Sequence, residues 1–376
     1  MVMVTQKMET YKIKLAIVLL NWNGKKWLEK FLPTLIKYSE KAKIYVIDNQ
    51  STDDSINYIQ NTFPNVNLII NKSNGGYSKG YNDGLKKINA KYFILINSDI
   101  EVTKNWTIPI ITLMDSSIKI AACQPKILDY NNKNMFEYAG ASGGFIDYLG
   151  YPYCRGRIFN SIEEDKGQYN NPIEIFWATG ACFIVRSVSF WEVGGFDEDF
   201  FAHQEEIDLC WRFKNKGYII MVEPKSVVYH VGGGTLSVDS PFKTYLNFRN
   251  NLSMLFKNLP LFYLFIVIPL RLFLDGIAAF FLLRQKKGVR HFLAVIKAHF
   301  SFYFKIPKLI GKRQKIQQKH QSFKILVRRS PLTPESPRSK SPKTQKTSTN
   351  TKNTTKKHKQ TQRNTNKSQN KQKQHN

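Results

Sequence analysis

Cysteine is scarce in this sequence of 376 residues, which has 4 of them, namely Cys123, Cys154, Cys182 and Cys210. They are too few for a disulfide framework and too scattered for paired zinc ligands. We therefore expect reduced thiols in a cytosolic protein. We also find no secretory signal, because the apolar run Leu15–Leu20 is shorter than a signal-peptide core and no Ala-x-Ala cleavage site follows it.

Acidic residues are scarce as well, with 28 Asp and Glu against 56 Lys and Arg, for a net charge of +28. The imbalance is concentrated in residues 311–376, which hold 19 basic residues and one acid, Glu335, and so carry +18. Beyond Ser330 there is no aromatic residue, so we predict a disordered basic tail. This composition predicts attraction to an anionic membrane surface and no specific nucleic-acid partner. A basic nucleic-acid-binding protein is the less favoured alternative.

An uninterrupted apolar run long enough for a bilayer span, about 20 residues, is also missing. The strongly apolar stretch Leu259–Leu283 is interrupted by Pro269, Arg271 and Asp275. We predict that 259–310 is an apolar and basic helical segment, which spans the membrane, re-enters it or lies at its inner, cytoplasmic face. A soluble helical subdomain with a solvated basic face is the alternative.

What the sequence does contain is a regular alternation of short apolar runs with helix-length polar segments before Cys123. The runs are Leu15–Leu20, Ile44–Ile47, Val66–Ile70 and Tyr92–Ile96. They predict an α/β fold with a mostly parallel central sheet. Ligands of such sheets bind outside the carboxyl ends of the strands. Three of these ends carry polar clusters, which begin at Asn21, Asp48 and Asn97.

Asp48 ends the second run and precedes Asn49-Gln50-Ser51-Thr52-Asp53. A carboxylate at a strand end can accept hydrogen bonds from a nucleobase or a ribose hydroxyl. Asn21 and Asn23 follow the neighbouring run, so we count them with Asp48 as candidate nucleotide-binding residues. The alternative is that Asp48 and its neighbours only cap and turn the chain.

The glycines that follow Asn74 do not have the Gly-x-Gly-x-x-Gly spacing, which excludes a dinucleotide fingerprint. Gly76, Gly80 and Gly84 lie four residues apart, and on a helix they would form a stripe that allows close packing against the sheet. Lys79 and the amides at Asn74 are candidates for binding a phosphate at the start of this helix.

Asn97 and Asp99 end the fourth run on the same side of an extended backbone. One Asp and one Asn suit Mg²⁺ or Mn²⁺, which completes its coordination with water and diphosphate oxygens. A capping role for Asp99 is the alternative. His230, at a later strand end before Gly232-Gly233-Gly234, is a second candidate for contacting the cation or a diphosphate.

Residues 204–216 predict a helix whose first turn is acidic. Glu206 falls on the predicted inward face, while Asp208 and Arg212 are spaced to form an ion pair on a different face. A carboxylate in the first turn of a helix can accept a proton from a substrate hydroxyl. An acidic helix start without catalytic function is the alternative.

These motifs, in this order over Lys14–Asn258, resemble family 2 glycosyltransferases of the GT-A fold, especially bacterial rhamnosyltransferase-like members. The resemblance implies that Asp48 binds the base of a nucleotide-sugar donor and that Asp99 binds a metal. It also implies that His230 helps to hold the cation or the diphosphate and that Glu206 is the catalytic base. Glu206 stands where the family usually has Asp, so Glu205 and Asp208 remain rivals.

The implied reaction is inverting sugar transfer to a hydroxyl of a glycan or lipid-linked acceptor in cell-surface polysaccharide synthesis. Trp177, Thr179 and Gly180 are the acceptor-binding candidates, because sugars stack on aromatic faces. A catalytically inactive binding module is the alternative, since Asn97 and Glu206 depart from the family's usual acids. The expected domains are an extension (1–13), the glycosyltransferase domain (14–258), the helical segment (259–310) and the tail (311–376).

Overall fold

The computed structural model describes residues 11–138, 140–158, 161–232 and 240–317, all within one compact unit of the chain. Most of the predicted N-terminal extension and of the predicted tail lies outside these residues, as does most of the glycine loop after His230.

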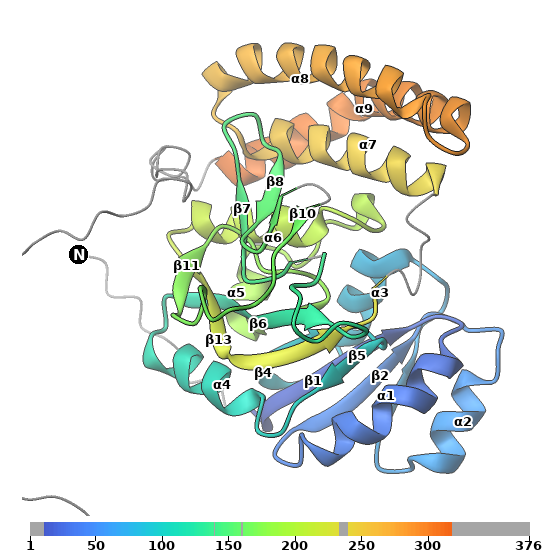
Figure 1. Cartoon of the computed structure of the whole chain (residues 1–376), viewed down its shortest axis with the longest axis vertical. Coiled ribbons are helices and arrows are strands. Elements are labelled where there is room, and N and C mark those ends of the chain that lie inside the picture. The colour runs from blue at the N-terminus through green and yellow to red at the C-terminus, as the bar shows by residue number, and fades with distance from the viewer. Residues whose placement is uncertain (1–10, 139, 159–160, 233–239, 318–376) are drawn as a thin grey trace, which may run out of the picture. The chain divides into compact units, whose positions relative to one another are not determined.

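The N-terminal half forms the predicted parallel sheet (Figure 1). Strands and helices alternate as β1 (Ile13–Asn21), α1 (Lys25–Lys37), β2 (Lys43–Asp48), α2 (Ser55–Thr62), β3 (Asn67–Ile70), α3 (Gly76–Leu85) and β4 (Ala90–Ile96). The strands lie in the order β4-β1-β2-β3, and each adjacent pair is parallel. The register pairs Asn21 with Asp48, so two of the predicted polar strand ends are neighbours.

The second half of the large sheet is mixed, in the order β11-β13-β6-β12 before β4, with β5 paired to β13. Its elements are β5 (Ile100–Val102), α4 (Thr107–Ser116), β6 (Ile120–Asp129), β11 (Ile173–Ile175), β12 (Cys182–Arg186), α5 (Ser187–Glu192), the 3-10 turn η1 (Glu198–Phe200), α6 (Glu205–Asn215) and β13 (Ile219–His230). Strand β12 runs antiparallel to β4 and β6. Strand β13 continues through Pro224, and its pairing with β6 shifts between Glu223 and Val227.

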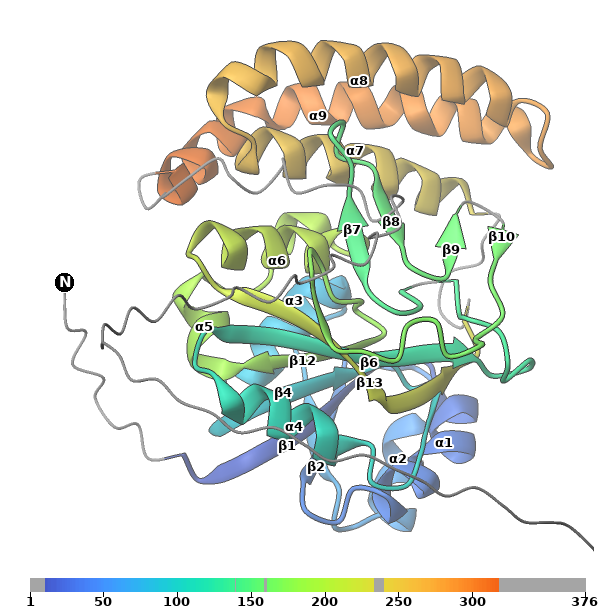
Figure 2. The same ribbon diagram turned by 60° about the vertical axis from the view of Figure 1, so that its left-hand side comes forward.

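A second, small sheet lies between the large sheet and the C-terminal helices (Figure 2). It consists of β7 (Gly144–Ile146), β8 (Pro152–Cys154), β9 (Arg157–Ile158) and β10 (Ser161–Ile162). This sheet occupies the glycine-rich stretch in which sequence periodicity predicts little.

Two apolar cores cover the two faces of the large sheet. One core joins Leu28 of α1, Ile59 of α2 and Ile110 of α4 to the sheet. The other joins Tyr81 of α3, Phe190 of α5 and the buried side of α6 to the opposite face. Each strand of the parallel half is therefore buried on both faces, which explains the continuous apolar runs in the sequence.

The C-terminal helices α7 (Pro241–Asn258), α8 (Leu261–Leu282) and α9 (Gly288–Gln317) lie together on the side of the unit opposite α1 and α2 (Figures 1 and 2). Within the described residues, α8 is the one helix long and apolar enough to cross a membrane, with a hydropathy of 2.1 over its most apolar window and 28% of that window buried. Soluble core helices pass the same criterion.

Two expectations for this region need correction. Pro269 does not divide the apolar stretch, because α8 continues through it. The tail does not begin at Gly311, because α9 extends to Gln317 and Arg313 donates to the carbonyls of Phe256 and Leu259. Arg271 and Asp275, one helical turn apart, form a buried pair at 3.4 Å.

Candidate active site

Asp48 is fully buried and organises the loop that follows β2. Its carboxylate accepts hydrogen bonds from the Asn21 amide (2.8 Å), from the Ser51 amide (2.8 Å) and from the Ser51 hydroxyl (2.7 Å). The Asn23 Oδ1 accepts the Thr52 amide at 2.7 Å from a left-handed backbone position (φ 51°). Asn21 and Asn23 therefore hold the loop after Asp48 from the neighbouring strand. This loop forms one edge of the region outside the carboxyl ends of the strands, which we call the strand-end region.

The glycine stripe on α3 packs as closely as its spacing predicts. A Cβ at Gly84 would lie 2.2 Å from the Ile47 Cδ1, and one at Gly80 would lie 2.6 Å from the Asn49 amide nitrogen. Asn74 caps the start of the helix by accepting the Gly76 amide at 3.0 Å. Lys79 is exposed and pairs with Asp83 at 2.6 Å on the outer surface of α3. That pairing satisfies the Lys79 charge within the protein.

The residues predicted to hold a cation do meet in space. His230 Nε2 lies 3.2 Å from the Asp99 carboxylate and 3.5 Å from the Asn97 amide nitrogen. On its other side, His230 Nδ1 lies 3.2 Å from the Glu137 carboxylate, at ion-pair distance but outside hydrogen-bond geometry. Asp99, Glu137 and His230 are all buried.

The charge of this cluster depends on whether His230 carries a proton or a cation is bound. Burial lowers the pKa of His230, but the nearby carboxylates of Asp99 and Glu137 outweigh burial and raise the pKa to about 10. A cation would replace that proton, because an imidazole binds metal in its neutral form. The donor set of one carboxylate, one imidazole and one amide oxygen fits Mn²⁺ or Mg²⁺ with water and phosphate oxygens as further ligands. No group of three or more His, Cys, Asp or Glu side chains in the described ranges is arranged to hold a metal by itself.

Glu205 and Glu206 open α6 and differ in their burial. Glu205 is 4% exposed, whereas Glu206 is half-buried, and the Oε2 atom of each is buried without a hydrogen-bond partner. Burial raises the pKa of Glu206 to about 7. Burial, assisted by the Glu206 charge, raises the pKa of Glu205 well above its usual value. Near neutral pH, Glu206 therefore exchanges a proton readily, which favours Glu206 as the base.

The segment before α6 has an unusual backbone. Phe201, His203 and Gln204 adopt φ values of 64°, 69° and 72°, in the region that favours glycine. Such residues cost about 1–3 kcal/mol each and persist only where surrounding contacts hold them. The Phe201 carbonyl accepts the Tyr77 amide at 2.7 Å, which joins this segment to the start of α3.

Asp208 does not belong to the catalytic set. It is fully buried and pairs with Arg212 at 2.9 Å, as the spacing predicts, and also with Lys257 of α7 at 2.9 Å. The Asn258 amide donates to the same carboxylate at 2.8 Å. The sequence predicts one buried stripe on α6, but α7 covers a second face, so Asp208 is a buried structural ion pair.

Of the acceptor candidates, Trp177 and Thr179 are buried and Gly180 lies next to Glu206. Trp177 is 5% exposed, donates from its indole nitrogen to the Phe145 carbonyl at 2.8 Å, and lies against Gly144. Its ring is therefore covered by β7 and is not an open stacking surface. Thr179 is buried as well. Gly180 lies closest to the acids, since a Cβ there would be 3.9 Å from the Glu206 Cβ.

Several contacts place these groups on one side of the sheet. Gly24 lies between Asn21 and Ser98, so the Asp48 loop adjoins the end of β4. Burial raises the pKa of the Cys154 thiol in β8 to about 12 although Arg157 opposes this change, and the charges of Glu137 and Glu206 also raise it. Both carboxylates therefore act on one buried thiol. The carboxyl ends of the strands and the start of α6 therefore surround a common region.

Sequence reasoning missed three residues of this region. Glu137 lies in the loop-rich stretch between β6 and β7, where no periodicity marks it. The Tyr77 hydroxyl donates to the Gly180 carbonyl at 2.8 Å, and burial and the charges of Tyr81, Glu205 and Glu206 raise its pKa well above its usual value. Lys243 of α7 is half-buried, and burial lowers its pKa while Glu137 opposes that change.

Comparisons with known proteins show what this chain is similar to. A low-salt glycan biosynthesis hexosyltransferase from Haloferax volcanii is 22% identical over 63% of this chain and 73% of its own length. An N-acetylglucosaminyl-diphospho-decaprenol L-rhamnosyltransferase from Mycobacterium tuberculosis is 24% identical over 57% of this chain and 75% of its own length. A crystal structure of GalNAc-T7 with UDP, GalNAc and Mn²⁺ aligns with 65% of this chain and 47% of that chain, at a TM-score of 0.49 and 17% identity. Residues 16–194 match the model of the glycosyl transferase family 2, so this part of the chain is a domain of that family.

Proposed function

We propose that this protein transfers a sugar, with inversion, from a nucleoside diphosphate sugar to a hydroxyl of a glycan or lipid-linked acceptor in cell-surface polysaccharide synthesis. The observation that carries the proposal is the state of Glu206. Its carboxylate is half-buried, retains an unpartnered oxygen and has a pKa of about 7. The charges of Glu206 and of Glu137, which lies in the cluster with Asp99 and His230, both raise the pKa of the Cys154 thiol.

In this proposal Glu206 takes the proton from the acceptor hydroxyl as that oxygen attacks the anomeric carbon, and the bond to the diphosphate breaks on the opposite side. A single base is sufficient for such a direct displacement, whereas retaining hydrolases use a second, nucleophilic carboxylate. The buried position of Glu206 keeps its basicity close to neutral pH, where a base is most effective.

Asp99 and His230, with Asn97, would hold the divalent cation, Mg²⁺ or Mn²⁺. When bound, such a cation neutralises the charge that develops on the leaving diphosphate. Glu137 would orient His230 through its second ring nitrogen, as carboxylates often do for metal-bound imidazoles. Lys243 adds a cation beside Glu137, which suits a diphosphate partner. Asp48 would receive the nucleoside.

The lipid-linked acceptor is supported by the relatives, one of which is named for a decaprenol-linked substrate. The surface of α8 and α9 also suits a membrane. Phe265, Phe273 and Phe304 are 75%, 65% and 84% exposed. Lys286 and Lys287 lie between the two helices. Exposed aromatic residues with adjacent cations favour the interface of an anionic bilayer. We therefore infer attachment at the inner face of the cell membrane.

The decisive experiment measures donor binding and transfer separately. A panel of nucleoside diphosphate sugars is screened by thermal shift with and without Mn²⁺, and the stabilising donors are then tested for transfer to polyprenyl-diphosphate sugars. We expect Mn²⁺-stimulated donor binding, which Asp99→Ala abolishes, and transfer that depends on the donor. A protein that binds donors but transfers no sugar to any acceptor would instead be an inactive binding module.

Membrane attachment is tested by flotation with phosphatidylglycerol vesicles and with neutral phosphatidylcholine vesicles. We expect the full chain to float with the anionic vesicles. Replacing Phe265 and Phe273 by Ser is expected to release it, while replacing the exposed Ile108 of α4 by Ser is not. Flotation that is unaffected by the phenylalanine changes would contradict the assignment of this surface.

A further inference from the structure

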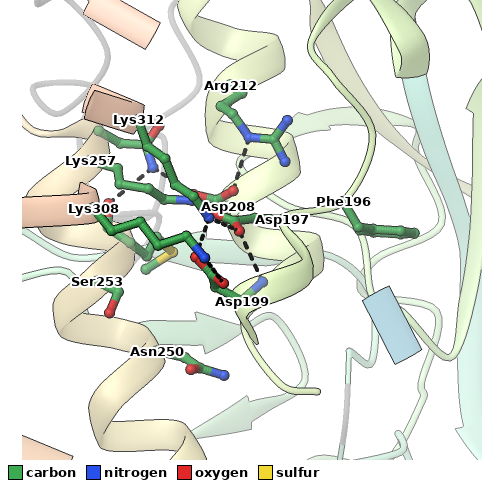
Figure 3. Close-up of polar contacts among 12 residues, drawn as sticks. Phe196, Asp197, Asp199, Asp208, Arg212, Asn250, Ser253, Lys257, Lys308 and Lys312 are labelled. Atoms are coloured by element: carbon green, nitrogen blue, oxygen red, sulfur yellow. Dashed lines mark hydrogen bonds and ion pairs between the residues drawn. The ribbon is translucent and has the colours of Figure 1, made fainter. Parts of the chain in front are cut away.

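Three lysines of the C-terminal helices contact the acidic segment that precedes α6 (Figure 3). Lys257 of α7 is 1% exposed and pairs with Asp197. Lys308 of α9 lies 2.6 Å from Asp199. Lys312, one turn further along α9, pairs with Asp197 and lies 2.5 Å from Asp199. We call these three residues the lysine clamp.

The clamp fixes the backbone as well as the two carboxylates. Asp197 also accepts the Asp199 amide at 3.1 Å and so caps the turn η1. Burial alone would raise the pKa of Asp197, but Lys257 and Lys312 hold it well below its usual value. The aspartate is therefore charged at neutral pH and bound from both helices at once.

The turn η1 leads directly into the left-handed residues Phe201, His203 and Gln204. Asn250 of α7 is fully buried, and its amide nitrogen lies within 3.0 Å of three carbonyl oxygens of this segment, those of Phe200, Ala202 and His203. The next residues are Glu205 and Glu206. An unfavourable backbone immediately before the candidate base is therefore held in place by contacts from α7 and α9.

We propose that Lys308 and Lys312 are positioning residues for Glu206. By binding Asp197 and Asp199 they fix the strained segment 201–204 in the conformation that directs the Glu206 carboxylate toward the acceptor hydroxyl. The inference rests on the proposed function of Glu206 as the base. It also connects two properties of one helix, because α9 carries exposed apolar residues such as Phe304 beside the two lysines. The helix that we assign to the membrane surface thus also supports the base.

The test uses the full chain with Lys312→Met. We expect kcat to fall about 10- to 100-fold while the KM for the donor stays within about twofold, because a displacement of about 1 Å at the base has effects of that size. Lys312→Arg keeps the charge and should recover most of the activity. Lys315→Met is the matched control, since Lys315 is exposed on the same helix and lies at ion-pair distance from no acid in the described part of the chain.

Unchanged kcat in Lys312→Met would overturn the inference, and so would an Arg variant as impaired as the Met variant. Lys308→Met removes one exposed contact and should lower kcat in the same direction by a smaller factor, which covers the case in which Lys312→Met does not fold. Hydrogen exchange of the amides at 200–206 provides a measurement that does not require transfer. Faster exchange in the Lys308 or Lys312 variants supports the inference and unchanged exchange refutes it, whereas absence of transfer by the unaltered protein refutes the proposed function alone.

Discussion

The candidate active site and the contacts of Asp197 and Asp208 with α7 and α9 treat buried charge in opposite ways. Around the candidate active site, Glu205, Glu206 and His230 each retain a buried polar atom without a hydrogen-bond partner. At the contacts with α7 and α9, the carboxylates of Asp197 and Asp208 are bound by lysine or arginine on more than one side. Incomplete pairing leaves a group able to react or to bind a ligand, whereas complete pairing serves structure. The two kinds of acid lie a few residues apart in the same sequence segment.

The largest expected effect concerns catalysis. Glu206→Gln keeps the size of the side chain but removes the base, so kcat should fall by about 10²- to 10⁴-fold with little change in donor affinity. Glu205→Gln is the matched control and should retain most of the activity, because Glu205 is more deeply buried and its raised pKa disfavours the ionised form that a base needs. Steady-state kinetics with a matched donor and acceptor separates the two. Equal losses in both variants would contradict the distinction drawn here.

Asp208, in contrast to Glu206, should affect the stability of the protein. Asp208→Asn leaves Lys257 and Arg212 without their shared partner in a buried position, so the free energy of unfolding should fall by about 3–5 kcal/mol. Urea denaturation measures this change. Lys133→Met breaks an exposed pair with Glu101 and should cost about 1 kcal/mol or less. A small loss of unfolding free energy in Asp208→Asn would mean that the buried contacts of Asp208 with α7 contribute little to stability.

Glu137 tests whether the strand-end cluster is a metal site. If Glu137 orients a metal-bound His230, Glu137→Gln should weaken Mn²⁺-stimulated donor binding by about 10- to 100-fold. Titration calorimetry with the donor, in the presence and absence of Mn²⁺, measures the change. Glu163→Gln, in the same loop-rich stretch but outside the cluster, is a suitable control. If the metal-independent affinity changes instead, Glu137 contacts the donor directly.

The pH dependence of turnover distinguishes the two glutamates further. Glu206 must be ionised to accept a proton, and its pKa is about 7, so kcat should rise about tenfold per pH unit below 7 and level off above it. The Glu205→Gln variant should keep this acidic limb. A profile that stays flat from pH 5 to pH 8 would exclude Glu206 as the rate-determining base.

The smallest expected effect is on stability. Because the pKa of Glu205 is raised in the folded state, the folded protein binds more protons than the unfolded chain above about pH 4.5, and the contribution of this group to stability declines as pH rises. Gln at this position does not ionise, so Glu205→Gln should gain stability relative to the unaltered protein between pH 5 and pH 8. Thermal melting across this range measures the trend. If the difference in stability between the two proteins stays constant from pH 5 to pH 8, the pKa of Glu205 is not raised in the folded state.

The strand-end residues could be predicted from the sequence because they directly follow short apolar runs. Asp48, Asn97 and Asp99 are placed by the strands that precede them, and parallel pairing brings such ends to one edge. Glu137 could not be predicted from the sequence, since it lies in a loop-rich stretch whose position depends on the small sheet. That the ring of Trp177 is covered could not be predicted either, because only the packing of β7 across the ring decides its exposure.

The sequence by itself determined the alternation of strands and helices, the polar strand ends and the acidic start of α6, because these depend on periodicity and on neighbours a few residues away. The spacing also predicted the pair of Asp208 with Arg212, but only the tertiary structure decided which acids are bound by distant helices. Lys257 and Asn258 bind Asp208, and Lys257 and Lys312 bind Asp197. Ion pairs and burial are set by groups that are close in space, and their separation along the chain leaves no local pattern to read.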